Sequence, residues 1–348
     1  MRNKRWTTYG KILGTAILAV LLVRALLVTS CFIPSSGMEN SLYKGEGVLV
    51  NKWSYGLRLP FPSWIGYHRL ATDKAVKGDV VVFNNPLPVK NNQRLETRDL
   101  FISRCIGTPG DTLLLNEDLL AVDGEVFSPD SKALFVYPSS SEDFLLETLM
   151  SLGLSDNALV GYAAGGKYIR SFSHYEYYLV TQRVGDSIPF TPFNESMARL
   201  QRTGEHRSLP DIVAISQTDS TRPTALDSVR HLTNNVVAQG LALGAHPFVI
   251  PTKGKSVRVY PWNVKLLCNT LVSHEHRKAT VKGDSLMLGG KYVQEVVFSK
   301  DYYWMASNDP VNFNDSRLFG FVPEDHLIGK AWLIWYPARK GRFFRRVH

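Results

Sequence analysis

The chain has 348 residues, 44% of them hydrophobic, and a formal net charge of +9. This length is enough for a buried core and is typical of two domains. The basic residues behind the net charge lie at the two ends, four before residue 12 and five after residue 338, while residues 12–338 are formally neutral. Because no basic patch lies between the ends, the sequence argues against a nucleic-acid partner.

Cysteine and histidine residues give no sign of a metal site. The three cysteines, Cys31, Cys105 and Cys268, are too few and too scattered for a disulfide framework or a zinc site. The SHEH stretch at 273–276 holds two histidines without a second cluster, and we interpret it as a solvated loop. We therefore expect no metal and no cofactor.

The first long apolar run, ILGTAILAVLLVRALLVTSCFI at 12–33, has the length of a membrane anchor. As a helix rising about 1.5 Å per residue, it would cross a bilayer core. Basic residues precede the run, so residues 1–11 are expected in the cytoplasm and the rest of the chain outside. Arg24 interrupts the run and is expected to snorkel to the interface.

Two other interpretations of this run remain open. Val28-Thr29-Ser30 resembles a small-residue cleavage site, and Ser30-Cys31 loosely resembles a lipoprotein processing site. A secretory apolar core usually has about 7–15 residues, and this one is longer and carries an arginine. We therefore favour an uncleaved anchor, and the sequence does not settle whether Cys31 carries a lipid.

The body after the anchor is predicted to be mostly β. Short apolar or β-branched runs bounded by Gly, Pro or Asn occur at 47–53, 78–83, 112–116 and 248–252. No sustained βα alternation is present, which argues against a parallel sheet. A PGD turn and a later D-G turn predict a hairpin within 107–127.

Residues 128–247 differ in sequence pattern from the β-rich stretches on either side, and a helix is predicted over SSSEDFLLETLMSLG at 139–153. We interpret 128–247 as an inserted α+β domain between two halves of a β core, 34–127 and 248–337. A basic tail, 338–348, follows.

Four stretches carry a family resemblance: IPSSGMENSLYKGEGVLVNKWSYG at 33–56, KGDVVVFNNP at 77–86, SRCIGTPGDTL at 103–113 and NDSRLFGFVPEDHLIGKA at 314–331. In this order after a membrane anchor, they resemble the type I signal peptidases, the S26 peptidases. The resemblance implies a mostly antiparallel β core on the outer membrane face with a second domain inserted. It also implies a Ser–Lys dyad, in which burial keeps the lysine neutral so that it can accept the serine proton.

The positions that match the dyad carry other residues. Gly37 stands at the nucleophile position and Ser103 at the position of the general base. Phe313 stands where the family has a serine that orients the lysine. These changes fit one another, because a hydroxyl that held an ammonium has no task once the ammonium is gone, and a phenylalanine can fill the vacated volume. The resemblance thus predicts lost catalysis.

Other positions of the same motifs agree with the family. They are expected to remain as parts of a peptide or oxyanion site: Ser35, Met38, Arg104, Asp315, Ser316 and Arg317.

Ser36 is the obvious substitute nucleophile, but in an extended chain it would face away from the old lysine site. Gly37 tolerates unusual backbone angles, so rescue by Ser36 stays open. A base is harder to supply, because Arg104 does not deprotonate in proteins, and Lys44 and Lys52 are predicted to stay solvated.

These observations favour a signal-peptidase-like protein without activity, single-pass in a bacterial inner membrane, with its main domain in the periplasm. It would bind extended peptides of exported precursor proteins or assist an active homologue. The alternative is an active signal peptidase that uses Ser36. A third hypothesis is a surface module whose FFRR tail at 343–346 touches lipid headgroups, although a solvated, frayed tail is the simpler interpretation. The bound peptide, the role of 128–247 and the oligomeric state stay open.

Overall fold

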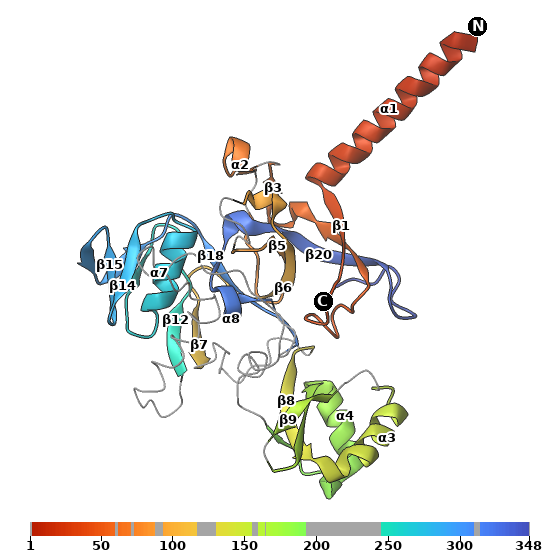
Figure 1. The fold of residues 1–348 in the computed structure, drawn as a ribbon. Coiled ribbons are helices and arrows are strands. Elements are labelled where there is room, and N and C mark those ends of the chain that lie inside the picture. Colours follow the sequence, from red (N-terminus) through yellow and green to blue (C-terminus); the bar gives the residue numbers. More distant parts are fainter. Residues whose placement is uncertain are drawn as a thin grey trace.

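The computed structural model describes residues 2–59, 62–70, 73–87, 93–116, 130–154, 159–163, 165–192, 245–309 and 314–347. The chain begins with helix α1 (Arg2–Leu26), which extends away from the body (Figure 1). Among the described residues, no helix combines the length and the apolar character of a membrane span.

The continuous helix predicted over 12–33 is wrong at its C-terminal end. Residues Val28–Phe32 form strand β1, which pairs antiparallel with β2 (Gly47–Asn51). The β-branched Val28 and Thr29 favour an extended chain, and the ladder with β2 satisfies their backbone groups.

The main sheet has seven strands in the order β1-β2-β20-β5-β6-β18-β19, and its recorded pairs are antiparallel. The remaining members are β20 (Leu327–Tyr336), β5 (Val80–Asn84), β6 (Leu100–Gly107), β18 (Tyr302–Ala306) and β19 (Val322–Pro323). The C-terminal strand β20 lies between β2 and β5, so two distant parts of the sequence form one sheet. The predicted mostly β fold is confirmed.

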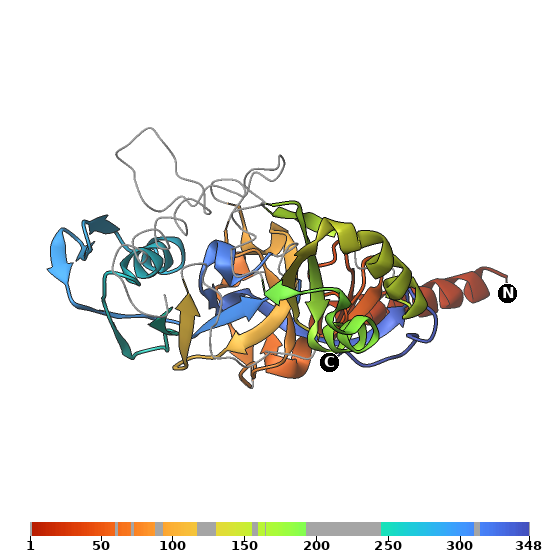
Figure 2. The ribbon, with the colours of Figure 1, turned by 90° about the horizontal axis from the view of Figure 1, so that it is seen from below.

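A second set of short elements extends the core to one side of this sheet, as Figures 1 and 2 show. It comprises β7 (Thr112–Asn116), β12 (Ala245–Val249), β13 (Ser256–Arg258), α7 (Val264–Ser273), β14 (Ala279–Lys282), β15 (Ser285–Leu288), β16 (Lys291–Val293) and β17 (Glu295–Val297). The apolar face of α7 is buried in the same cluster as Trp304 and Phe321. This packing joins the set to the main sheet.

Several short elements connect the strands of the core. They are the 3₁₀ helices η1 (Lys52–Tyr55), η2 (Leu95–Thr97) and η5 (Glu324–His326), the strands β3 (Leu57–Arg58) and β4 (Arg69–Leu70), and the helices α2 (Pro62–Ile65) and α8 (Ser316–Phe319).

Residues 130–192 form a second lobe with its own sheet, ordered β11-β8-β10-β9. Its elements are β8 (Lys132–Pro138), η3 (Ser139–Ser141), α3 (Glu142–Ser151), β9 (Leu159–Ala163), β10 (Lys167–Ser173), α4 (His174–Val184), η4 (Gly185–Ser187) and β11 (Thr191–Pro192). Tyr137, Leu145 and Phe172 lie in a cluster that contains only residues of this lobe. The helix predicted at 139–153 is present as η3 and α3.

Two local predictions need correction. The strand predicted at 248–252 is β12, which ends at Val249, shortly before Pro251, a residue that has no N–H to donate to a ladder. The first arm of the hairpin predicted within 107–127 is β7, but β7 pairs with β12. The second arm and its D-G turn lie outside the described residues.

The basic tail is solvated at 343–346, as predicted, but its described part is not frayed, because the Phe344 N–H donates to the Ile334 carbonyl at 2.8 Å. Val347 is buried in a cluster with Ile33 and Val48. The Arg342 guanidinium forms an ion pair with Glu46, a carboxylate that is fully buried. The tail therefore stabilises the segment between β1 and β2.

Gly329 in β20 is required by a close backbone approach. A Cβ at this position would lie 2.3 Å from the backbone oxygen of Asn51. We expect Gly329→Ala to lower the free energy of unfolding by about 1–3 kcal/mol, because the backbones of β2 and β20 would have to separate. Gly161→Ala is the matched control, since a Cβ in that strand of the second lobe meets nothing within 4 Å. Scanning calorimetry tests this, and equal midpoints for the two variants would contradict it.

Candidate functional site

The site predicted from the motifs is built on the turn at 34–41, which follows β1. Met38 anchors this turn, because its side chain is 1% exposed and packs in a cluster with Ile33, Leu42 and Val48. The Glu39 N–H donates to the Ser36 carbonyl at 2.8 Å, and the Leu42 N–H donates to the Met38 carbonyl at 2.7 Å. Ser35 and Ser36 are half-buried. The turn is therefore fixed to the core, and of its three serines only Ser41 is buried.

Gly37 occupies the predicted nucleophile position, and it has no side chain to react. It is buried, and its carbonyl accepts a hydrogen bond of 3.0 Å from the Asp309 N–H. Ser36, next to it, donates its hydroxyl to Asp309 Oδ2 at 3.1 Å. The substitute serine thus contacts a carboxylate.

Ser103, at the predicted position of the general base, lies on β6 and is fully buried. Its hydroxyl donates to the backbone carbonyl of Asn314 at 3.2 Å. A serine hydroxyl has no neutral amine lone pair to accept a proton at this place. Phe313, the predicted third changed position, lies outside the described residues.

Arg104 joins three parts of the site. Its guanidinium donates to the Gly78 carbonyl at 2.9 Å, to Ser41 Oγ at 2.6 Å and to Asn308 Oδ1 at 3.4 Å. Burial lowers the pKa of Arg104 and the nearby Asp130 carboxylate opposes this shift, but a guanidinium stays protonated in proteins. Arg104 is therefore a structural cation and cannot serve as a base.

Asn308 completes this network from the segment after β18. Its side-chain amide donates to the Glu39 carbonyl at 3.0 Å and to Ser41 Oγ at 2.9 Å. Asp309, the next residue, also contacts the turn, through the Gly37 carbonyl and the Ser36 hydroxyl. The segment just before the fourth motif is therefore joined to the turn.

The second lobe also touches the turn, which the sequence did not predict. The Lys132 ammonium lies 2.6 Å from Glu39 Oε2, and the Lys132 side chain is 3% exposed. The Lys132 N–H donates to the Asn308 carbonyl at 2.8 Å, and Ser41 donates its hydroxyl to the Asp130 carboxylate. No local pattern reveals these contacts, because Lys132 and Glu39 are 93 residues apart.

The Lys132–Glu39 pair could be mistaken for a displaced catalytic dyad, because it brings a buried lysine against a side-chain oxygen of the turn. That oxygen belongs to a carboxylate, however, and the contact is an ion pair. The family mechanism needs a neutral amine beside a hydroxyl. This pair differs from that arrangement in both partners.

The fourth motif holds its own chain segment together. Asp315 is fully buried and accepts hydrogen bonds from the Ser307 N–H at 2.7 Å and from the Arg317 N–H at 3.0 Å. Its carboxylate also forms an ion pair with the Arg317 guanidinium. Ser316 Oγ accepts from the Met305 N–H at 2.9 Å. These contacts fix α8 against β18, beside Asn314 and thus beside Ser103.

The lysines considered as substitute bases lie elsewhere. Lys52 donates from its ammonium to the carbonyls of Arg24 at 2.9 Å and Ala25 at 3.1 Å, at the C-terminus of α1. Burial lowers the pKa of Lys52. Lys44 is exposed. Neither has a recorded contact with Ser36.

Two strand edges near the turn have a single strand partner among the described residues. β1 ends the main sheet and pairs only with β2. In β6, residues 100–104 pair with β5, while the ladder with β18 involves only Arg104, Cys105 and Gly107. Within the described part of the chain, residues 100–102 of β6 therefore have no strand partner opposite β5, and Ser103, which follows them, is fully buried.

Metal-ligating residues are not gathered at this site. Within the described ranges, no group of three His, Cys, Asp or Glu side chains is placed to hold a metal ion. The SHEH stretch is not a solvated loop throughout, because His274 is 4% exposed and packs beside the rings of Tyr302 and His326. Ser273 is the last residue of α7, and His274 follows it with its side chain in the core.

Glu39 and Lys132 allow a test of this lobe contact. Glu39→Gln leaves a buried ammonium without its counter-charge, so we expect the free energy of unfolding to fall by about 1–3 kcal/mol. The double variant Glu39→Leu with Lys132→Met should recover most of this loss, because it buries no charge. Urea unfolding followed by circular dichroism measures both. Equal losses in the single and double variants would show that the pair does not couple.

Comparison with known proteins agrees with these motifs. The family model "Signal peptidase, peptidase S26" matches residues 6–152 and 249–336. Signal peptidase I of Pseudomonas aeruginosa is 35% identical over 119 residues, which cover 34% of this chain and 38% of that protein. The probable signal peptidase I-2 of Synechocystis is 31% identical over 123 residues, covering 35% of this chain and 47% of that protein. The matched part thus spans less than half the length of these relatives.

Proposed function

The chain belongs to the peptidase S26 family of signal peptidases, and we propose that it is a member without peptidase activity that binds extended segments of exported proteins. The observation that carries this proposal is the content of the two dyad positions. Gly37 offers no side chain, and the Ser103 hydroxyl is bonded to the Asn314 carbonyl. Neither position supplies a nucleophile or a neutral amine.

The size of the expected loss follows from how catalytic groups cooperate. In serine peptidases, removal of members of the catalytic unit costs about 10⁶ in kcat, and binding and oxyanion groups retain roughly 10³–10⁴ over water. Ser35, half-buried at the start of the turn, is the remaining hydroxyl that matches the oxyanion serine of the family. A protein with these losses retains binding long after useful turnover is gone.

Peptide binding by strand addition is supported by the edge of β6 at 100–102, which has no strand partner opposite β5 among the described residues. Backbone donors and acceptors there can pair with an extended segment, and alternate side chains then supply specificity. Arg104, in the same strand, ties β6 to the turn through Ser41. The network that once served catalysis would then serve to keep the binding edge rigid.

We further propose that the protein works at a bacterial inner membrane, N-terminus in the cytoplasm, with signal peptides of exported precursors, or with an active homologue, as partners. Support comes from α1, whose apolar side chains from Ile12 to Val23 are largely exposed in the chain by itself. The family supports precursor signal peptides as ligands.

The alternative function is an active signal peptidase with displaced chemistry at Ser36. One observation favours it: the Ser36 hydroxyl already has an acceptor, Asp309 Oδ2, at 3.1 Å. A carboxylate is a far weaker base than the neutral lysine of the family, because its conjugate acid ordinarily has a pKa near 4. The inactive member is therefore the better-supported function.

We expect the purified full chain, in lipid nanodiscs, to leave exported precursor proteins uncleaved while binding them. The test mixes the chain with precursors whose processing by the P. aeruginosa signal peptidase I serves as the positive control. Gel mobility reports cleavage and co-sedimentation with the nanodiscs reports binding. Cleavage that disappears in Ser36→Ala would establish the alternative function.

Restoring the dyad tests whether the scaffold is retained. Gly37→Ser, Ser103→Lys and Phe313→Ser in one chain should produce cleavage at least about tenfold above the wild-type background, because binding and oxyanion groups persist when the unit is lost. The matched control carries Ser103→Met in place of Ser103→Lys, which keeps an apolar stem without the amine. Circular dichroism checks that both variants fold. Equal cleavage by both would contradict a retained site.

A further inference from the structure

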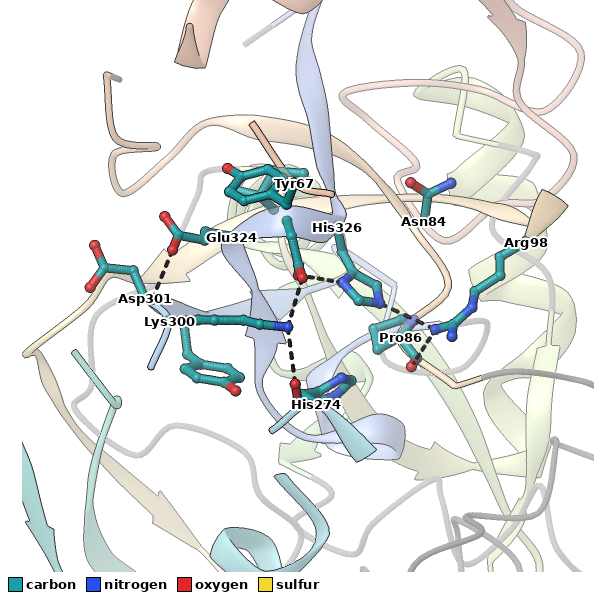
Figure 3. Close-up of polar contacts among 12 residues, drawn as sticks. Tyr67, Asn84, Pro86, Arg98, His274, Lys300, Asp301, Glu324 and His326 are labelled. Atoms are coloured by element: carbon teal, nitrogen blue, oxygen red, sulfur yellow. Dashed lines mark hydrogen bonds and ion pairs between the residues drawn. The ribbon is translucent and has the colours of Figure 1, made fainter. Parts of the chain in front are cut away.

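A second polar cluster lies apart from the turn, where η5 joins β19 to β20. We call it the His326 cluster, and its members are Arg98, His274, Lys300, Asp325 and His326. Arg98 follows η2, His274 follows α7 and Lys300 precedes β18, while Asp325 and His326 lie in η5. Figure 3 shows His326 with Arg98 on one side and with Lys300 and His274 on the other. His326 and His274 are 5% and 4% exposed, whereas the Lys300 side chain is 26% exposed, so the two rings are buried at the inner side of a partly exposed cluster.

Hydrogen-bond roles fix the protonation state of His326. Its Nε2 lies 3.2 Å from Arg98 Nη1, and a guanidinium has only donors, so Nε2 must carry a lone pair. Its Nδ1 lies 2.8 Å from Asp325 Oδ1, and a carboxylate only accepts, so Nδ1 must carry the proton. His326 is therefore the neutral Nδ1–H tautomer, held between a donor and an acceptor.

Arg98 hydrogen-bonds to both ends of the segment that connects β5 to β6. Its Nη1 also donates to the Pro86 carbonyl at 3.0 Å and to the Asn85 carbonyl at 3.3 Å. Its Nε donates to the Gln93 carbonyl at 3.5 Å. One guanidinium thus binds residues 85–86 just after β5, residue 93, and the ring of His326 in η5.

We propose that the Arg98–His326 hydrogen bond is a pH-sensitive latch that holds residues 85–87 and 93–98 on the core. A proton added to Nε2 removes the only acceptor that His326 offers to Arg98. It also places a second cation 3.2 Å from the guanidinium, in a partly buried site where like charges repel more strongly than in water. Arg98 must then move away, and the two ends of the segment that it binds move with it.

The surrounding charges set the pH at which the latch opens. The charged or titratable groups that act on His326 are Asp325 of η5, Arg98 after η2, Lys300 before β18 and His274 just after α7. Glu324 of η5 and Arg58 of β3 act on the neighbouring Asp325. Burial lowers the pKa of His326 first, Asp325 opposes this, and Arg98 and Lys300 add to it. Burial likewise lowers the pKa of His274, and the neighbouring His326 lowers it further.

These directions give the sign of the pH dependence. Both folded-state pKa values lie below the ordinary histidine value near 6.5. The latch is therefore closed above about pH 6.5, and its stabilisation is lost as the pH falls through that value towards the folded-state pKa. Acidification, and not alkalinisation, should release the segment.

Hydrogen exchange measured by mass spectrometry on the full chain in nanodiscs tests the latch. After correction for intrinsic rates, we expect amides at 93–98 to exchange faster at pH 5 than at pH 7.5, because the folded-state pKa of His326 lies below its ordinary value. His326→Gln offers an acceptor that cannot titrate, and it should remain protected at both pH values. His174→Gln, at an exposed position of α4, should behave as the wild type.

A second measurement covers the case in which His326→Gln does not fold. Nitrogen NMR of the wild-type chain labelled on histidine reports the protonation of His326 directly. The expected result is a neutral Nδ1–H ring at pH 7.5 whose protonation coincides with the loss of protection at 93–98. Protection that is equal at both pH values, or loss that is the same in folded His326→Gln, would overturn the latch.

Discussion

The candidate site depends on one buried cation. The Arg104 guanidinium, 4% exposed, needs acceptors in every direction because an unpaired charge is costly in the interior. It finds them on three separate segments, at Gly78, Ser41 and Asn308. Satisfying this cation therefore forces β6, the turn and the segment after β18 into one arrangement. The same requirement explains why the turn keeps its shape although Gly37 gives it no reactive group.

The residues that hold the site in shape are therefore different from the residues that would carry out catalysis. A peptidase of this family needs both a rigid frame and a hydroxyl beside a neutral amine. The frame survives in Met38, Arg104 and Asp315, each buried and each bonded or packed within the protein. The chemistry depends on two further side chains, and the proposed loss of activity rests on Gly37 and Ser103 at those positions. Such a protein can lose turnover without losing its fold, since different residues carry the two properties.

Local patterns in the sequence were enough to predict much of the fold. The runs at 112–116 and 78–83 are strands because β-branched and apolar residues lie between glycine and asparagine boundaries. The assignment of Gly37 and Ser103 to the dyad positions came from the family resemblance, and it stays a prediction. The features that could not be predicted are contacts between distant parts of the chain. The insertion of β20 between β2 and β5, the Lys132–Glu39 pair and the burial of His274 each join residues far apart in the chain. A window of neighbouring residues contains no signal for them.

The position of β20 has a consequence for how the protein is made. The last strand of the chain is an interior strand of the sheet, so β2 and β5 leave the ribosome with unpaired edges facing each other. Synthesis of residues 85–326, at about 5–20 residues per second, takes roughly 12–50 seconds. Throughout that interval the nascent chain exposes two templates for aggregation. Its biogenesis should therefore depend on a holding chaperone more than that of proteins whose sheets close in order of synthesis.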